Sequence, residues 1–208
     1  MPPTPEIDAI LRTLHVTTWN PAAQAQGQQA AALALTIYAG HTRDQGTPYL
    51  QHPLAVVGIL RDELAVTTPN TLLLGLLHDA LEISPGSAPT VASRFGEDFA
   101  EQLRAMTPDH RLDERPKQSG DEATWREKTT RLSPEGLLVR LADRIHNLRD
   151  LRNSPNTARR ERFVTALAEF YLPLAERARP INTHLEAACT VLMAEFERYQ
   201  RDTQEARI

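Results

Sequence analysis

The chain has 208 residues, of which 41% are hydrophobic and 24% are charged, and its formal net charge is −4. This length and composition allow one soluble globular domain with a buried core and do not fit a disordered chain. The charge balance excludes general nucleic-acid binding through a basic surface, and no apolar run is long enough to span a membrane.

The start of the sequence and its cysteine content favour one compartment. Residues 1–14 lack the basic start and apolar centre of a secretory signal. Cys189 is the single cysteine, which excludes an intrachain disulfide and suits a reducing environment. We therefore expect a cytoplasmic protein, whose oligomeric state the sequence does not indicate.

The spacing of apolar residues predicts an all-α protein, because these residues recur at helical intervals and glycine and proline fall between the periodic segments. In chain order we expect helices over residues 21–39, from near 52 to before 66, over 71–81 and from about 90 to 104. A polar segment over 108–131 indicates a surface loop followed by a short helix. Further helices are expected over 134–151, 156–177 and 180–205, the last as a structural brace.

Polar residues end the buried segment "LLLGLLHDALEI" abruptly. A buried imidazole or carboxylate needs a charge partner, a hydrogen bond or a metal ion, and the adjacent His78 and Asp79 offer one nitrogen and one oxygen ligand. In a continuous helix, Glu82 would share a face with His78. Taken alone, the pair is also consistent with a histidine and an aspartate that hydrogen-bond to each other.

Two other segments add polar residues to apolar surroundings. His52 opens a predicted helix in "YLQHP", and Asp143 lies within the leucine-rich helix over 134–151, where an unpaired carboxylate would be penalised. Three helices could therefore converge on one metal ion. We expect His146 and Arg149, also in that helix, to lie on a solvated or salt-bridged face.

Five segments resemble, in order and spacing, the hydrolase domain of RelA/SpoT proteins, which belongs to the HD superfamily. The resemblance covers about residues 28–178 and is carried by "GTPYLQHPLAVVGIL", "LLLGLLHDALEI", "FGEDFAEQLRAMT", "LVRLADRIHNLRDL" and "FYLPLAERA". It implies an HD-domain helical bundle with a single divalent-metal site, similar to stand-alone small alarmone hydrolases. We accordingly expect an amino-terminal segment over 1–20, a hydrolase domain over 21–178 and a bracing helix over 179–208.

The resemblance also implies an activity: hydrolysis of the 3′-pyrophosphate of ppGpp and pppGpp with one divalent ion, usually Mn²⁺. Transferred position by position, the metal ligands are His52, His78, Asp79 and Asp143. Glu82 is placed to orient water or exchange protons, and Asn147 matches a nucleotide-contacting asparagine. The arginines expected to bind the anionic substrate are Arg43, Arg144 and Arg162.

Three positions depart from the family pattern on the substrate side. Relatives usually carry a second acid directly after the glutamate, where this chain has Ile83. The loop "HTRDQG" is short and offers Arg43 alone where an Arg-Lys pair is common. Ala166 stands where a hydroxyl-bearing side chain is frequent. All four expected metal ligands thus match the family pattern, whereas the identity of the substrate stays open.

Three functions remain open on this basis. The first is a Mn²⁺-dependent alarmone hydrolase acting on a small-molecule nucleotide, with no nucleic-acid or membrane partner. The second is an HD phosphohydrolase of another nucleotide such as NADPH, because of the altered substrate-side residues. The third is a catalytically weakened nucleotide-binding module, because Ile83 removes an acid.

Overall fold

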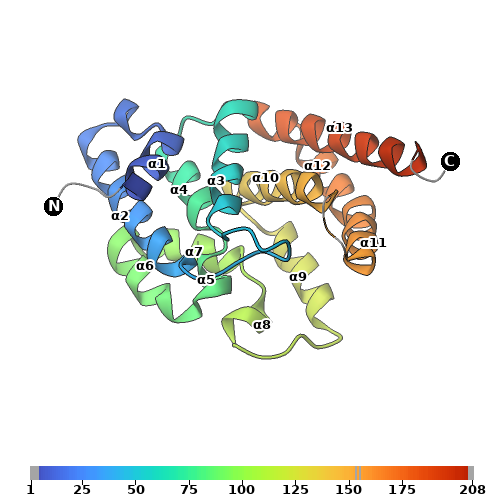
Figure 1. Ribbon diagram of the computed structural model, residues 1–208, viewed down its shortest axis with the longest axis horizontal. Helices are drawn as coiled ribbons and strands as arrows, with labels where there is room; N and C mark the ends of the chain where they lie inside the picture. Colours follow the sequence, from blue (N-terminus) through green and yellow to red (C-terminus); the bar gives the residue numbers. More distant parts are fainter. Residues whose placement is uncertain (1–4, 153, 155, 206–208) are drawn as a thin grey trace.

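The computed structural model describes residues 5–152, 154 and 156–205, and it is built from α-helices (Figure 1). Within these residues no β-strand forms, and one isolated β-bridge pairs Thr42 with Pro48. The all-α prediction is therefore confirmed. The α-helices are α1 (Pro5–Leu14), α2 (Pro21–Tyr38), α3 (Gln51–Gly58), α4 (Pro69–Leu77), α5 (Ala80–Ile83), α6 (Ala88–Phe95), α7 (Glu97–Ala105), α8 (Asp109–Leu112), α9 (Asp121–Thr130), α10 (Pro134–Leu151), α11 (Thr157–Ala166), α12 (Leu172–Ala178) and α13 (Thr183–Glu205). Short 3₁₀ helices and π-turns are η1 (Val16–Thr18), η2 (Ile59–Glu63), η3 (Pro85–Ser87) and η4 (Leu167–Tyr171).

Helix α10 lies at the centre of the fold, as Figure 1 shows. Its start is set by Ser133, whose side chain accepts a hydrogen bond from the Gly136 amide at 3.1 Å, and by Pro134 in the first turn. Its leucine face is buried, and α10 packs against α3, α4 and α13. The predicted bounds of 134–151 are confirmed, and this packing brings α3, α4 and α10 together.

Helix α4 is almost entirely buried, but it is shorter at its end than the helix predicted over 71–81. All residues from 71 to 77 are buried. The helix ends at Leu77, and at Asp79 the backbone leaves helical geometry with φ −98° and ψ 4° before α5 begins. The prediction of one continuous helix was therefore wrong, because apolar periodicity continues across the break and hides it.

Three other predicted helices are interrupted in the structure. The helix expected from near 52 to before 66 consists of α3 followed by the π-turn η2. The helix expected from about 90 to 104 is split into α6 and α7 at Gly96, whose φ of +92° suits glycine and cannot belong to a right-handed helix. The helix expected over 156–177 contains the π-turn η4 between α11 and α12. Such a turn leaves the apolar pattern intact, so periodicity does not reveal it.

A short hairpin over residues 41–49 connects α2 to α3. The Tyr49 amide donates to the His41 carbonyl, and the Arg43 amide donates to the Thr47 carbonyl, both at 2.9 Å. The Gly46 amide closes a turn onto the Arg43 carbonyl at 2.9 Å, and Gly46 has φ +78°. The turn residues are thereby held in one place beside α10.

The last helix, α13, packs along α10 and α12. Arg149 of α10 donates to the buried Glu195 of α13 at 3.0 Å and to Glu63 at 2.6 Å. The salt-bridged face predicted for Arg149 is confirmed. No helix in the described part of the chain combines the length and the apolar character needed to cross a membrane.

A substitution at Gly75 can test how tightly α3 and η2 pack on α4. A Cβ atom at Gly75 would lie 2.6 Å from Leu60 Cδ1, and Leu60 is fully buried, so it has no room to move. We expect Gly75→Ala to lower the free energy of unfolding by about 1–3 kcal/mol, measured by urea denaturation. Gly58→Ala is the control, since its Cβ meets nothing within 4 Å and alanine should stabilise the helix slightly. Equal stability of Gly75→Ala and the native protein would contradict this packing.

Candidate functional site

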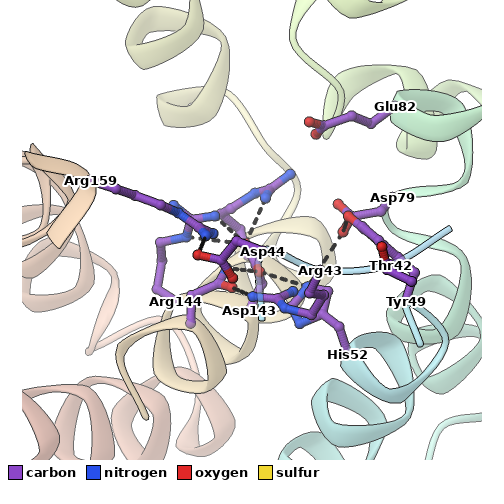
Figure 2. A pocket seen from close by; sticks show the side chains of 12 residues that line it. Thr42, Arg43, Asp44, Tyr49, His52, Asp79, Glu82, Asp143, Arg144 and Arg159 are labelled. Carbon is purple, nitrogen blue, oxygen red and sulfur yellow. Dashed lines mark hydrogen bonds and ion pairs between the residues drawn. The ribbon is translucent and has the colours of Figure 1, made fainter. Parts of the chain in front are cut away.

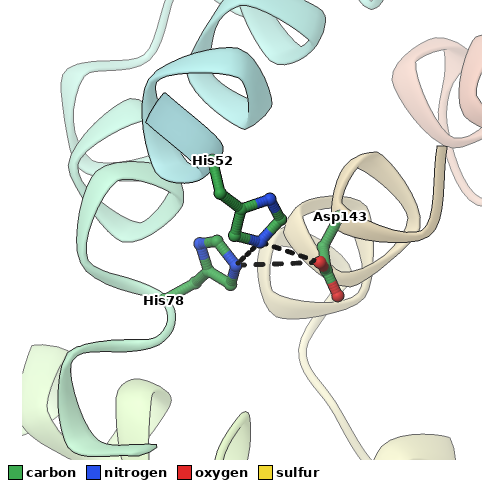
Figure 3. A group of neighbouring side chains, drawn as sticks. All are labelled: His52, His78 and Asp143. Atoms are coloured by element: carbon green, nitrogen blue, oxygen red, sulfur yellow. Dashed lines mark hydrogen bonds and ion pairs between the residues drawn. The ribbon is translucent and has the colours of Figure 1, made fainter. Parts of the chain in front are cut away.

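Three elements bring a cluster of buried histidines and carboxylates together, as Figure 3 shows for His52, His78 and Asp143. His52 lies in α3, His78 directly follows the end of α4, and Asp143 lies within α10. Their ligand atoms all lie within 4.8 Å of one another. His52 Nε2 lies 3.2 Å from both His78 Nε2 and Asp143 Oδ1. Asp79 Oδ2 lies 3.4 Å from His52 Nε2 and 3.3 Å from His78 Nε2. The structure thus gathers the four residues predicted as metal ligands.

The break after α4 places neighbouring residues around the same point. Because Asp79 leaves helical geometry, His78 and Asp79 both face His52 although they are adjacent in sequence. Glu82 belongs to the new helix α5, so the expected shared helical face with His78 does not exist. Instead, Glu82 lines the same cavity as Asp79.

Hydrogen bonds define which ring nitrogens can bind a cation. His78 Nδ1 lies 2.7 Å from the Gly75 carbonyl, which can only accept, so Nδ1 donates a proton there and Nε2 is the nitrogen that can bind a cation. His52 Nδ1 faces His146 Nδ1 at 2.8 Å. In a neutral His52 ring, Nε2 can bind a cation only when the proton is on Nδ1, and Nδ1 then donates to His146.

His146 was predicted to lie on a solvated or salt-bridged face, and that prediction was wrong. The side chain is half-buried and contacts His52. Burial, with the nearby His52 and Arg43, lowers the pKa of His146 to about 4, so its ring is neutral and able to accept. In the sequence, His146 stands three residues after Asp143 and four before Asp150, and this spacing did not indicate a contact with His52.

The charges of the cluster suit a divalent cation. Burial alone would raise the pKa of Asp143, but Arg144, His52 and Arg140 hold it well below the usual range. The pKa of Asp79 is likewise held well below its usual range by His78 and His52, against the effect of burial. Two buried carboxylates and two imidazole nitrogens form a mixed oxygen and nitrogen donor set that fits a borderline divalent ion.

A cavity of about 270 Å³ opens beside this cluster (Figure 2). Tyr49 contributes a hydroxyl that donates to Asp79 Oδ2 at 2.8 Å. Glu82 lies about a third exposed, 3.3 Å from Arg111 Nε. The residues lining the cavity are Thr42, Arg43, Asp44, Tyr49, His52, Asp79, Glu82, Arg140, Asp143, Arg144, Asn147 and Arg159.

Most of the predicted substrate residues lie in this cavity. Arg43, Arg144 and Asn147 line it, and Asn147 Nδ2 donates to Asp143 Oδ1 at 2.5 Å. Arg162 does not line it, because its side chain is on an exposed face of α11. Arg159, almost one turn earlier on the same helix, reaches the cavity instead.

Arg140 is a buried part of the site that the sequence reasoning missed. Its guanidinium donates to Asp143 Oδ2 at 2.8 Å and also to the Met106 carbonyl. The available signal was an arginine between Val139 and Leu141, inside the apolar stripe of α10. A charge at such a position needs a buried partner, and Asp143 lies one turn later.

A second cavity of about 240 Å³ adjoins the first at Arg144. Its walls combine the rings of Trp125, Phe163 and Tyr171 with charged side chains, among them Lys117, Asp121 and Glu122. The Arg144 guanidinium carbon lies 5.2 Å from the ring centre of Phe163 and 5.1 Å from that of Tyr171. Trp125 Nε1 donates to the Tyr171 hydroxyl at 3.2 Å, and the guanidinium of Arg140 lies over the Trp125 ring. Ala166 also lines this cavity.

Metal binding is expected to release a proton from His52. Burial alone would lower the pKa of His52, but hydrogen bonds and charges from Asp143 and Asp79 raise it above the ordinary value. A metal ion and a proton compete for Nε2, so Mn²⁺ affinity should fall as the pH drops through that raised pKa. Titration calorimetry at about pH 6 and pH 8, in two buffers of different ionisation enthalpy, counts the protons released.

The exposed His41 provides the matched control for this experiment. His41→Gln should leave both the affinity and the number of released protons unchanged. An Mn²⁺ affinity that is the same at both pH values would contradict the predicted competition.

Comparison with known proteins gives consistent similarities. A family model described as "HD domain" matches residues 30–179. The chain is 32% identical over 163 residues to the bifunctional (p)ppGpp synthase/hydrolase SpoT of Escherichia coli K12, covering 76% of this chain and 23% of SpoT. It is 32% identical over 153 residues to the mouse guanosine-3′,5′-bis(diphosphate) 3′-pyrophosphohydrolase MESH1, covering 73% of this chain and 82% of MESH1.

A solved structure extends the similarity to the fold. The structure described as "A metazoan ortholog of SpoT hydrolyzes ppGpp and plays a role in starvation responses" matches with a TM-score of 0.65 and 24% identity. The match covers 86% of this chain and 96% of that one. The chain therefore shares this helical fold over most of its length, while it spans about a quarter of the length of SpoT.

Proposed function

This chain belongs to the HD domain family, and from that premise we propose that it hydrolyses the 3′-pyrophosphate of guanosine alarmones. In this reaction ppGpp yields GDP and pyrophosphate, and pppGpp yields GTP and pyrophosphate. The observation that carries the proposal is the buried cluster of two histidines and two aspartates at the wall of an arginine-rich cavity. The names of its relatives SpoT and MESH1 support the choice of substrate.

The proposed metal ion is Mn²⁺, held by His52, His78, Asp79 and Asp143. When bound there, a divalent ion supplies positive charge that polarises a phosphoryl oxygen and lowers the pKa of water. The hydrogen bond from His78 Nδ1 to Gly75 and the contact between His52 and His146 orient the two rings toward that ion. The Tyr49 hydroxyl does the same for Asp79.

Glu82 is the proposed proton acceptor of the reaction. Burial, and then the negative charge of Asp79, raises the pKa of Glu82 above its ordinary value, which makes its carboxylate a better base. The attacking water loses a proton to Glu82 as its oxygen bonds to phosphorus. The bond from phosphorus to the 3′ oxygen breaks, and that oxygen takes up a proton from solvent to become the 3′ hydroxyl, while Glu82 returns its proton to solvent.

Arginines and the second cavity position the nucleotide in this proposal. Arg43, Arg144 and Asn147 face the cavity beside the metal residues, where they can bind phosphate oxygens. The base and ribose fit the adjoining aromatic cavity, whose rings and guanidinium group can stack with a purine. Arg162 retains only the weaker proposed role of attracting the substrate from the protein surface.

A second candidate is an HD phosphohydrolase of another nucleotide, such as NADPH. Ala166 lines the aromatic cavity without a hydroxyl group, and Ile83 packs against the hydrophobic core where an acid would follow Glu82. The third candidate, a weakened nucleotide-binding module, rests on Ile83 alone. If Ile83→Asp leaves an already rapid turnover unchanged, the weakened-module proposal is wrong.

A nucleotide panel with added Mn²⁺ tests these proposals. We expect pyrophosphate from ppGpp and pppGpp, and much slower release of phosphate from NADPH. Phosphate from NADPH without any product from ppGpp would favour the second candidate. Binding of ppGpp without turnover would favour the third. Repeating the panel with Mg²⁺, Zn²⁺ and Co²⁺ tests the proposed preference for Mn²⁺.

The assignment of regions follows the same proposal. We propose residues 21–178 as the hydrolase domain, residues 1–20 as an amino-terminal segment and residues 179–208 as the bracing helix. The ion pairs of Arg149 and Arg152 with Glu195 support that role for α13. The proposed location is the cytoplasm, where guanosine nucleotides are available.

A further inference from the structure

Asp44 places a negative charge inside the cavity proposed to bind phosphate. It lies in the turn of the hairpin over residues 41–49 and lines the cavity. Its Oδ2 accepts hydrogen bonds from the Ser154 hydroxyl at 3.0 Å and from Arg159 Nη1. Burial alone would raise the pKa of Asp44, but Arg159 and Ser154 lower it, so the carboxylate is ionised at neutral pH.

Each arginine of the cavity already has an acidic partner. Arg140 and Arg144 both donate to Asp143, which is one of the proposed metal ligands. Arg43 donates to Asp150 at 2.9 Å and to Asn147 at 2.8 Å. Arg159 is paired with Asp44. A phosphate group that uses Arg159 must therefore compete with Asp44.

Asp44 and Arg159 line the cavity on the side away from the proposed proton acceptor. Figure 2 places Arg159 on the side opposite Asp79 and Glu82, with Asp44 between Arg159 and Asp79 in this view. Both side chains are partly exposed, at 27% for Asp44 and 42% for Arg159. With the 3′-pyrophosphate at the metal residues and the base in the adjoining cavity, the 5′-phosphates are the remaining anionic groups, and among the described residues Arg159 is the cavity arginine that does not contact a proposed metal ligand or Asn147.

We infer that Asp44 is a specificity-determining residue that neutralises Arg159 and so disfavours phosphate at the 5′ end of the bound nucleotide. This inference rests on the proposed function for the orientation of the nucleotide. Asp44 repels the 5′-phosphates directly and also occupies the guanidinium that would bind them. Removing its charge frees Arg159 for the substrate.

The test compares two substrates that differ only at the 5′ end: ppGpp and guanosine 3′-diphosphate. We expect Asp44→Asn to lower KM for ppGpp by about two- to fivefold, the range of a partly exposed ion pair, with kcat unchanged. KM for guanosine 3′-diphosphate should stay the same. Asp98→Asn, an equal change of charge on the exposed side of α7, should alter neither value.

A purely structural role for Asp44 predicts a different result. If the pair only ties α11 to the hairpin, Asp44→Asn loosens the cavity and raises KM for both substrates alike. An equal change for both substrates, no change, or weaker binding of ppGpp would overturn the inference. Arg159→Gln is the second variant: with Asp44 left unpaired, KM should rise for ppGpp and not for guanosine 3′-diphosphate. In that background Asp44→Asn should restore ppGpp binding only partly, because Arg159 is gone.

Failure of the proposed function can be told apart from failure of this inference. If the native protein hydrolyses neither compound, the proposed function is wrong. The same two compounds are then titrated calorimetrically, and the ratio of their Kd values in Asp44→Asn and the native protein decides the role of Asp44. An unchanged ratio would rule that role out.

Discussion

Replacing Asp143 with asparagine is expected to weaken Mn²⁺ binding sharply, to remove most of the activity and to destabilise the fold. Asp143 Oδ1 faces His52, while Oδ2 accepts from the buried Arg140 and from Arg144 at 2.8 and 2.5 Å. Asparagine has nearly the same shape but no charge, so two guanidinium groups lose their carboxylate in the interior. Breaking such a buried ion pair costs about 3–5 kcal/mol, which urea denaturation of the metal-free protein would measure.

The metal affinity gives the second readout of the same variant. Loss of a ligand should weaken Mn²⁺ binding by at least about 100-fold, measured by calorimetry. Asp150→Asn is the control on the same helix, because Asp150 is partly exposed and pairs with Arg43. Its effect on stability should be smaller than that of Asp143→Asn, with metal affinity unchanged. Native Mn²⁺ affinity in Asp143→Asn would refute the proposed metal centre.

Replacing Glu82 with glutamine is expected to separate catalysis from metal binding. The variant should lose about 10²- to 10³-fold in kcat, the usual contribution of a general base, while Mn²⁺ affinity and stability stay native. The raised pKa of Glu82 adds a signature. With Mn²⁺ kept saturating at every pH, the kcat of the native enzyme should fall as the pH drops through that pKa, because the carboxylate becomes protonated, and the glutamine variant should lack this acidic limb.

Glu101→Gln is the matched control, since Glu101 is exposed on α7 and pairs with Arg104. It should keep native kcat and the native pH profile. A Glu82→Gln enzyme with native kcat, or with the same acidic limb, would exclude Glu82 as the proton acceptor. One series of steady-state measurements with ppGpp across the pH range gives both kcat and the pH profile.

The sequence predicted a helix correctly where a capping residue and a proline mark its start. Ser133 and Pro134 mark the start of α10, and the leucine stripe fixes its buried face. The break after Leu77 carried no such signal, because apolar residues continue on both sides of His78 and Asp79. The resemblance to RelA/SpoT hydrolase domains is confirmed by the family match and by the similarity to SpoT and MESH1.

The contents of the site were predictable where the residue type was costly to bury. His52, His78, Asp79 and Asp143 stood out among apolar neighbours, and the structure brings them together. His146 and Asp44 did not stand out, because each lies among polar residues and acquires its partner only through tertiary contact. Whether Arg159 or Arg162 faces the cavity depends on the rotation of α11, which its polar sequence does not determine.

Trp125 makes the site visible to fluorescence spectroscopy. Its indole ring lies between the Arg140 guanidinium and the Tyr171 hydroxyl, on the wall shared with the aromatic cavity. The other tryptophan of the chain, Trp19, is buried beside α2, away from both cavities. Indole emission responds to nearby charge, so Trp19→Phe yields a protein whose single tryptophan reports nucleotide occupancy without any label. Stopped-flow mixing would then time the arrival of the ligand separately from bond cleavage.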